Sequence, residues 1–219
     1  MNPDTRKRLN LLPPEALLKT GEVDHAEWNF RPILGSIIRI RYKLILSLLS
    51  GRRYRRMLEI GYGSGVFMPE LARRCDGLYG IDVHPNQEAV VETLSRFNVV
   101  AGLFSGSAEA MPFESGHFDC VVTASTLEFI EDLDSACAEI RRILAPGGSF
   151  IAVMPGHSPL LDLELWALTG RSAKADYGDR RRLVIPTLLR HFTAQKKLTV
   201  PSIGNSVIGI YTALKLCPG

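Results

Sequence analysis

Short apolar runs alternate with helical patterns between residues 56 and 155 of the chain. Apolar runs bounded by glycine, proline or charged residues are typical of buried strands, and their alternation with helices is typical of a parallel sheet. We therefore predict strands at residues 56–60, 78–82, 99–104, 118–124 and 149–154.

Two of the intervening helices carry clear start and stop signals. Pro85 can stand in the first turn of a helix whose apolar residues recur on one face, namely Val90, Val91, Leu94 and Phe97. Asp132 or Asp134 can cap a later helix, which the Pro-Gly-Gly run at 146–148 would end. The apolar positions of this second helix follow the helical period: Leu133, Ala136, Cys137, Ile140, Ile143 and Leu144.

Two regions lie outside this alternation. Residues 1–55 contain helical patterns, the strongest at 33–49. Residues 156–219 begin with a helix-like stretch around 160–168 and end with strand-like runs at 197–201 and 207–216, which would complete the sheet. We expect an α/β fold with an N-terminal helical cap over 1–55 and a main domain over 56–219, including a substrate lid within 156–195.

Composition narrows the class of protein without naming a function. Of the 219 residues, 46% are hydrophobic and 22% charged, which is typical of a globular protein with a substantial core. The cysteines are far apart and show no metal-binding spacing: Cys75, Cys120, Cys137 and Cys217. We therefore expect reduced thiols, a cytoplasmic location and no metal. Pro13 and Pro14 interrupt anything resembling the apolar core of an export signal.

The chain has a net charge of +3, and its basic residues are unevenly distributed. Between Glu27 and Glu59 there is no acidic residue, but there are eight basic ones: Arg31, Arg39, Arg41, Lys43, Arg52, Arg53, Arg55 and Arg56. Such a segment raises the question of a nucleic-acid partner. No RNA-binding module is recognisable, and Asp176 and Asp179 dilute the second basic run at 180–182, so the sequence disfavours nucleic acid.

The sequence LEIGYGSG at residues 58–65 follows the first predicted strand. A glycine loop that leads from a strand into a helix points backbone N–H groups and the positive end of the helix dipole at one place, which favours an anionic or dipolar ligand. Taken alone, the loop is equally consistent with a tight structural turn. A dinucleotide fingerprint would need its third glycine at position 66, which is Val66, so the spacing disfavours an NAD-dependent reductase.

Asp82 stands at the predicted carboxyl end of the next strand. Ligands of open α/β sheets bind beyond the carboxyl ends of the strands, where an acidic side chain can accept both hydroxyl hydrogens of a ribose. The alternative is a structural role, in which Asp82 caps the helix that Pro85 begins. Together with the glycine loop, the carboxylate suggests a nucleoside ligand.

Five motifs in order resemble the class I S-adenosylmethionine-dependent methyltransferases: LEIGYGSG at 58–65, YGID at 79–82, GSAEAMPF at 106–113, FDCVVTASTLEFI at 118–130 and LAPGG at 144–148. Within that class the chain looks like the small-molecule and lipid group that includes the ubiquinone/menaquinone C-methyltransferases. The resemblance implies a Rossmann-like, mostly parallel seven-stranded sheet flanked by helices. It also implies S-adenosyl-L-methionine as the cofactor and a small-molecule or lipid-like methyl acceptor.

The resemblance further implies roles for individual residues. Glu59 and the loop Gly61, Tyr62, Gly63, Ser64 and Gly65 would hold the methionine part of the cofactor, and Asp82 its ribose hydroxyls. The adenine would lie between Val83 on one face and Ser107 with Ala108 at its edge, and Ser125 would lie near the sulfonium end.

Two positions depart from the family pattern. Ser107 stands where relatives often have an aspartate that accepts from the adenine amino group, and Phe129 stands where a histidine is common. Three alternatives to an enzyme of this class stay open: an NAD-dependent reductase, a noncatalytic protein or partner subunit that binds the cofactor, and a plain α/β interaction module.

The sequence does not identify a catalytic residue. Methyl transfer from a sulfonium needs mainly in-line positioning and exclusion of water, and it needs a base only when the acceptor must lose a proton. His157 could point into the site from the loop after the fifth strand, although a histidine in such a turn is commonly structural. Tyr177 with Asp176, and His191, are weaker candidates in the lid.

The helix predicted at 33–49 bears on the acceptor. Ser36, Arg39, Lys43 and Ser47 form one narrow polar stripe, while Arg41 falls within the apolar face. Such a helix either packs on the sheet and roofs the site or, with the arginines at 52–56, meets anionic lipid. We favour the roof and keep peripheral membrane contact through residues 33–56 as the alternative. The oligomeric state cannot be deduced from the sequence.

Overall fold

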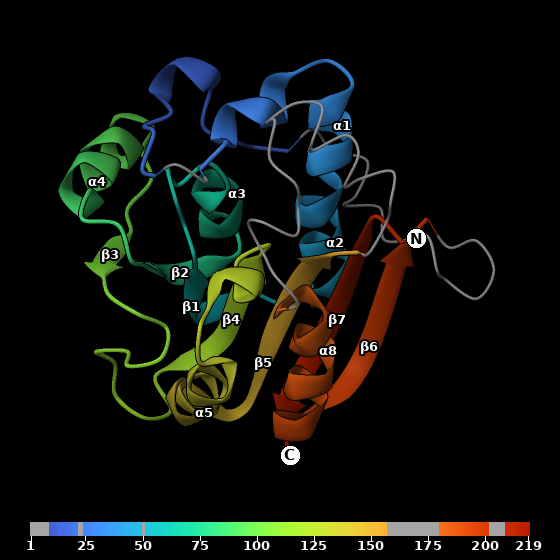
Figure 1. Cartoon of the computed structure of the whole chain (residues 1–219). Helices are drawn as coiled ribbons and strands as arrows, with labels where there is room; N and C mark the ends of the chain where they lie inside the picture. The colour runs from blue at the N-terminus through green and yellow to red at the C-terminus, as the bar shows by residue number, and fades with distance from the viewer. Residues whose placement is uncertain (1–8, 22–23, 50, 157–179, 202–208) are drawn as a thin grey trace.

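The computed structural model describes residues 9–21, 24–49, 51–156, 180–201 and 209–219 (Figure 1). Within these residues, seven strands form one sheet in the order β3-β2-β1-β4-β5-β7-β6. The strands are β1 (Tyr54–Ile60), β2 (Cys75–Asp82), β3 (Gly102–Ser105), β4 (Phe118–Ala124), β5 (Leu144–Pro155), β6 (Phe192–Val200) and β7 (Tyr211–Pro218). The first five are parallel, and β7 runs antiparallel to both β5 and β6. The predicted seven-stranded, mostly parallel sheet is therefore confirmed.

Helices cover both faces of the sheet (Figure 1). One core contains side chains from α2 (Ile40–Leu48), α3 (Met68–Ala72) and α4 (Gln87–Arg96), and the other contains side chains from α5 (Leu133–Ile143) and α8 (Arg180–His191). Along β5 the residues alternate between them: Ile151 and Val153 face the first core, and Phe150 and Ala152 the second. This period of two explains why a buried parallel strand is apolar throughout.

Helix α5 follows its sequence prediction closely. Asp132 is the N-cap, and its Oδ1 accepts a hydrogen bond from the backbone N–H of Ser135 at 3.0 Å. The helix ends at Ile143, three residues before Pro146, because Leu144 already pairs with Phe118 of β4. The ladder then resumes between Ser149 and Cys120, so the Pro-Gly-Gly run forms an irregularity within β5.

Two helix predictions need correction. The helix expected at 33–49 is divided into α1 (Leu34–Ile38) and α2, with a break at Arg39, whose guanidinium donates to the backbone oxygen of Asn29. Helix α4 begins at Gln87 after its N-cap Asn86, so Pro85 precedes the helix and does not stand in its first turn. Val90 and Leu94 are buried as expected, but Val91 and the C-cap residue Phe97 are exposed. Contacts with neighbouring elements decide where the first helix breaks and which side chains of the second are buried. The spacing of apolar residues in the sequence carries no information about those contacts.

The N-terminal part of the described chain lies beside the glycine loop. Two short 3-10 helices, η2 (Pro14–Ala16) and η3 (Ala26–Phe30), precede α1. The backbone N–H of Leu12 donates to the carbonyl oxygen of Val66 at 3.0 Å. Helix α2 packs on β4, β5 and β7, and most of its apolar side chains are buried. The boundary predicted at residue 55 stays a prediction.

Several predictions concern residues outside those described. They are the helix-like stretch at 160–168, most of the lid at 156–195 and the first residues of the strand-like run at 207–216. The described part of the lid is α8, which contacts α5 and η4 (Leu127–Phe129), and the first residues of β6. None of the described helices has the length and apolar character that crossing a bilayer requires.

The burial of α5 yields a stability prediction. Ile140→Ala should lower the free energy of unfolding by about 2–5 kcal/mol, because Ile140 is fully buried between the helix and the sheet and a cavity would remain. Urea denaturation measures this change. The neighbouring Arg141 is exposed, so Arg141→Ala should stay within about 0.5 kcal/mol of the wild type. Equal effects of the two substitutions would contradict the packing described.

Candidate active site

The functional loops gather at the carboxyl ends of the parallel strands. Strand β1 lies between β2 and β4, and the order of the strands along the chain reverses there. Open α/β sheets bind their ligands at such a switch point, because the loops on either side diverge and leave a crevice. The glycine loop follows β1, Asp82 ends β2 and Ser125 follows β4, so the sequence-predicted residues come from three neighbouring strands.

The glycine loop depends on backbone conformations that favour glycine. Gly61, Gly63 and Gly65 have φ values of +77°, +52° and +74°. A Cβ on Gly61 would also lie 2.2 Å from the Oγ1 of Thr126, so there is no room for a side chain. The backbone N–H of Gly61 donates to the carbonyl oxygen of Ile81 at 2.8 Å, which joins the loop to β2.

Asp82 and His84 hold the loop from the neighbouring strand. The Oδ2 of Asp82 accepts from the backbone N–H of Gly63 at 2.8 Å. The Nδ1 of His84 accepts from the N–H of Asn86 at 3.1 Å, so Nε2 carries the proton and donates to the carbonyl oxygen of Gly63 at 3.0 Å. Helix α4 has Asn86 as its N-cap, so Asp82 does not cap it. The alternative in which Asp82 caps this helix is therefore wrong.

A pocket of about 250 Å³ opens beside these groups. Five predicted residues line it: Gly61, Asp82, Val83, Ser107 and Ala108. The side chain of Val83 is 76% exposed and free to cover a flat ligand. The hydroxyl of Ser107 accepts from the N–H of Glu109 at 3.1 Å and lies 3.3 Å from the carboxylate of Glu109, so it is held by its own turn.

The other predicted cofactor residues lie outside the lining of this pocket. Tyr62 and Ser64 are buried, and their hydroxyl oxygens have no hydrogen-bond partner among the described residues. The ring of Tyr62 packs edge-on against His84 at 4.9 Å between ring centres. Gly63 and Gly65 follow in the same loop. Ser125 follows β4 with φ +60°, a strained value for a serine, and its N–H donates to Val153.

Glu59 is the buried acid of the site. Glu59 is only 4% exposed, and its Oε2 has no hydrogen-bond partner among the described residues. Burial raises the pKa of Glu59 to about 8; Arg41 opposes this shift and Asp82 adds to it. A buried carboxylate without a donor is costly, so a ligand that brings an ammonium or N–H group to it would be favoured.

Sequence reasoning missed several residues here and noted Phe129 only as a departure from the family pattern. Thr126, Phe129 and Ile130 line the pocket from the segment after β4, and His84 orients the loop. The motif at 118–130 was the only signal for the first three, and no pattern singles out His84. Arg41 of α2 acts electrostatically on Glu59 and also on a second buried acid, Glu128.

The catalytic candidates find no support in the described residues. His157, Asp176 and Tyr177 lie outside them. His191 ends α8, and its Nε2 lies 2.6 Å from Oδ1 of Asp134 on α5. That contact pairs His191 with an exposed surface carboxylate, so it plays a structural part there.

The donor set fits S-adenosylmethionine. Gly61 leaves a cradle without a side chain, the unpartnered oxygen of Glu59 suits an ammonium group, and Asp82 has a carboxylate at the mouth of the pocket for hydroxyl groups. Among the described residues, no group of histidine, cysteine and acidic side chains is arranged to hold a metal ion.

Gly61→Ala should destabilise the fold more than the matched change Gly147→Ala. Both glycines have φ near the left-handed region, but a Cβ on Gly147 would meet nothing within 4 Å, whereas one on Gly61 would meet Thr126. We expect about 1–2 kcal/mol for Gly147→Ala and a larger loss for Gly61→Ala, measured by chemical denaturation. Equal losses would show that the contact with Thr126 has no energetic weight.

The raised pKa of Glu59 predicts a pH-dependent stability. The folded state keeps the proton between the ordinary value of 4.5 and about 8. This contribution is fully present below the lower value and is lost as the pH rises through the upper one. From about pH 5 to about pH 8, the wild type should lose a few kcal/mol relative to Glu59→Gln, since each pKa unit is worth about 1.4 kcal/mol.

Thermal unfolding across this pH range checks the prediction. The slope should become shallower in Glu59→Gln without vanishing, because Glu128 also has a raised pKa. Glu88 is exposed on α4, so Glu88→Gln should keep the wild-type slope. A slope unchanged by Glu59→Gln would show that Glu59 is charged in the folded protein throughout.

Comparison with known proteins shows which domains the chain is similar to. Residues 58–152 match the family described as a methyltransferase domain. An uncharacterised protein of Mycobacterium bovis is 35% identical over 152 residues, which are 69% of this chain and 48% of the relative. A malonyl-[acyl-carrier protein] O-methyltransferase of Geobacter sulfurreducens is 33% identical over 129 residues, 55% of this chain and 46% of the relative. The chain thus spans about half the length of these relatives.

A solved structure agrees with this assignment at the level of the fold. The N-methyltransferase NodS of Bradyrhizobium japonicum WM9, in complex with S-adenosyl-L-homocysteine, superimposes with a TM-score of 0.61 over 90% of this chain and 93% of its own, at 21% identity. Residues 58–152 of this chain therefore match a methyltransferase domain in sequence, and the described sheet has the fold of this N-methyltransferase.

Proposed function

We propose that the protein transfers a methyl group from S-adenosylmethionine to a small-molecule or lipid-like acceptor. One observation carries the proposal: at the switch point of the sheet, Asp82 holds the N–H of Gly63 at the mouth of a pocket, beside a loop that leaves no room for a side chain at Gly61. A ribose needs an acceptor for its hydroxyl groups, an adenine needs apolar walls, and a charged amino-acid tail needs backbone donors.

The chain's own residues divide the binding between them. Glu59 and the loop from Gly61 to Gly65 would hold the methionine part, and Asp82 the ribose hydroxyls. The adenine would lie against Val83, bordered by Ser107 and Ala108, and Ser125 would lie near the sulfonium. The bound cofactor supplies an electrophilic methyl group, so the protein has mainly to orient the acceptor and exclude water.

The acceptor is proposed as a small molecule because the relatives suggest it. Their names specify malonyl-[acyl-carrier protein] for one and N-methylation for another. A quinone precursor, as in the group that the motifs resemble, is a narrower form of the same proposal. Most of the apolar side chains of α2 are buried, which supports the hypothesis that this helix covers the site more than the hypothesis that it contacts a membrane. In the segment 33–56, Ile33 is the most exposed apolar side chain, at 78%.

Two rival functions make different predictions. A noncatalytic protein or partner subunit would bind S-adenosylmethionine but form no S-adenosylhomocysteine with any acceptor. An NAD-dependent reductase would bind nicotinamide cofactor, and its fluorescence quenching would reveal this. Val66 at the third glycine position of the dinucleotide fingerprint speaks against the reductase.

Calorimetric titration tests cofactor binding. The wild type should bind S-adenosylmethionine and its demethylated product, and Asp82→Ala should weaken both by at least about tenfold, because each lost charge-assisted hydrogen bond is worth about 1.5–3 kcal/mol. Asp76 lies at the other end of β2 and pairs with Arg53, so Asp76→Ala is the matched control and should leave both affinities unchanged. The proposal fails if the wild type binds neither ligand.

A further inference from the structure

Glu128 is a buried acid that cofactor binding does not explain. It is the middle residue of η4, in the segment that follows β4, and is only 1% exposed. Neither carboxylate oxygen has a hydrogen-bond partner among the described residues. It also does not line the 250 Å³ pocket, whose wall in this segment is formed by Thr126, Phe129 and Ile130.

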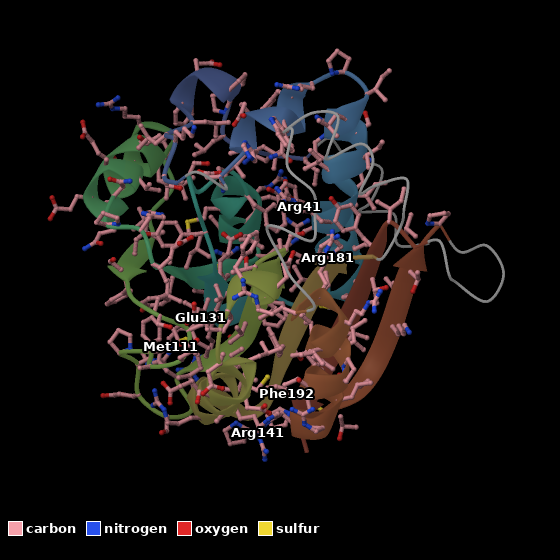
Figure 2. All side chains as sticks on the ribbon, in the orientation of Figure 1. Arg41, Met111, Glu131, Arg141, Arg181 and Phe192 are labelled. Carbon is pink, nitrogen blue, oxygen red and sulfur yellow. The ribbon has the colours of Figure 1, made fainter. Side chains whose placement is uncertain are left out.

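Charged and polar groups from three elements act on this carboxylate. Arg41 comes from α2, Arg181 from α8 and Tyr211 from the start of β7, and each interacts electrostatically with Glu128. Figure 2 shows Arg41 and Arg181 at the end of the molecule where α2 meets β5, away from Arg141 and Phe192. Arg41 also acts on Glu59 of β1. The cluster thus adjoins the proposed methionine end of the cofactor site.

An ordinary buried ion pair does not account for the arrangement. Arg41 donates from Nη2 to the hydroxyl oxygen of Tyr42 at 2.8 Å, and its guanidinium stacks over that ring at 4.8 Å. Its Nε is enclosed and has no acceptor among the described residues. Buried donors and acceptors are normally paired with each other, since leaving them unpaired costs free energy. Here Arg41 and Glu128 lie in one cluster without a hydrogen bond between them.

We propose that Glu128 and Arg41 form the binding site for the methyl acceptor, and that the acceptor presents a proton-bearing nucleophile, a hydroxyl or an amine, to Glu128. This inference rests on the proposed function. The O–H or N–H of the acceptor donates a hydrogen bond to the carboxylate of Glu128. An oxygen elsewhere on the acceptor accepts a hydrogen bond from the Nε–H of Arg41. An acceptor whose reacting atom carries no such proton would leave the carboxylate buried and unpaired.

The electrostatics of the cluster suit this role. Burial raises the pKa of Glu128 to about 7, opposed by its own backbone N–H and by the charges of Arg181 and Arg41. Near neutral pH the carboxyl group can therefore exist in either form, which is the condition for accepting a proton from a bound nucleophile. In the sequence, Arg41 is the charged residue on an otherwise apolar helix face. Its interaction with Glu128 explains why a charge stands at that position.

A pair of cofactor analogues provides the probe. Sinefungin carries an amine where S-adenosylmethionine carries its sulfonium methyl, whereas S-adenosylhomocysteine carries nothing there. Because the acceptor nucleophile must stand beside that methyl, Glu128 should stabilise the protonated amine. The ratio of the two affinities, sinefungin over S-adenosylhomocysteine, removes effects that both ligands share, including those of Glu59 and Asp82.

We expect Glu128→Gln to lower this ratio by at least about fivefold, measured calorimetrically at about pH 8. Its affinity for S-adenosylhomocysteine should stay within about twofold of the wild type. Glu88→Gln, on the exposed side of α4, is the control and should change neither value. A ratio unchanged by Glu128→Gln, with both ligands still bound, would overturn the proposal.

The wild type gives a second and independent measurement. Its ratio should fall several-fold between about pH 8 and about pH 6, as Glu128 takes up a proton. A ratio that is constant over this range would also overturn the inference, even if Glu128→Gln failed to fold. If the wild type bound neither analogue, the proposed function itself would fail, so the two failures are distinguishable.

Discussion

The attachment of the glycine loop to the end of β2 is the constraint on which the site depends. Both backbone groups of Gly63 are occupied by side chains of that strand and its loop: its N–H by Asp82 and its carbonyl oxygen by His84. The hydrogen bond from Gly61 to Ile81 adds a third link. A loop held at three points keeps its conformation without a ligand, which reduces the entropy lost on binding.

This attachment also sets the division of the site into two halves. On the β2 side lie Asp82, Val83 and the turn of Ser107, with a pocket of modest size and partly apolar walls. On the β4 side lie Glu59, Glu128 and Arg41, where charge is buried and incompletely paired. The first half suits a nucleoside and the second a charged or hydrogen-bonding group, and the switch point of the sheet brings them together.

The cap and the sheet cooperate in this division. Helix α2 covers β4, β5 and β7 with apolar side chains, and the same helix brings Arg41 to the acids at the strand ends. The apolar packing supplies the free energy that holds a partly desolvated guanidinium in place. The charge of Arg41 on the apolar side of α2 is therefore consistent with the packing of this helix, because Arg41 interacts with the buried acids Glu59 and Glu128.

The sequence by itself determined the sheet, the helix α5, the loop motif and the position of Asp82 at the end of β2, because each rests on a local signal. Apolar runs mark buried strands, Asp132 caps its own helix, and glycine tolerates positive φ. Only the tertiary structure decided that Asp82 clamps Gly63 instead of capping α4, that the helix at 33–49 breaks at Arg39, and that Arg41 and Glu128 share one cluster. These outcomes depend on groups far apart in the chain whose burial and pairing arise only when the strands and helices pack together.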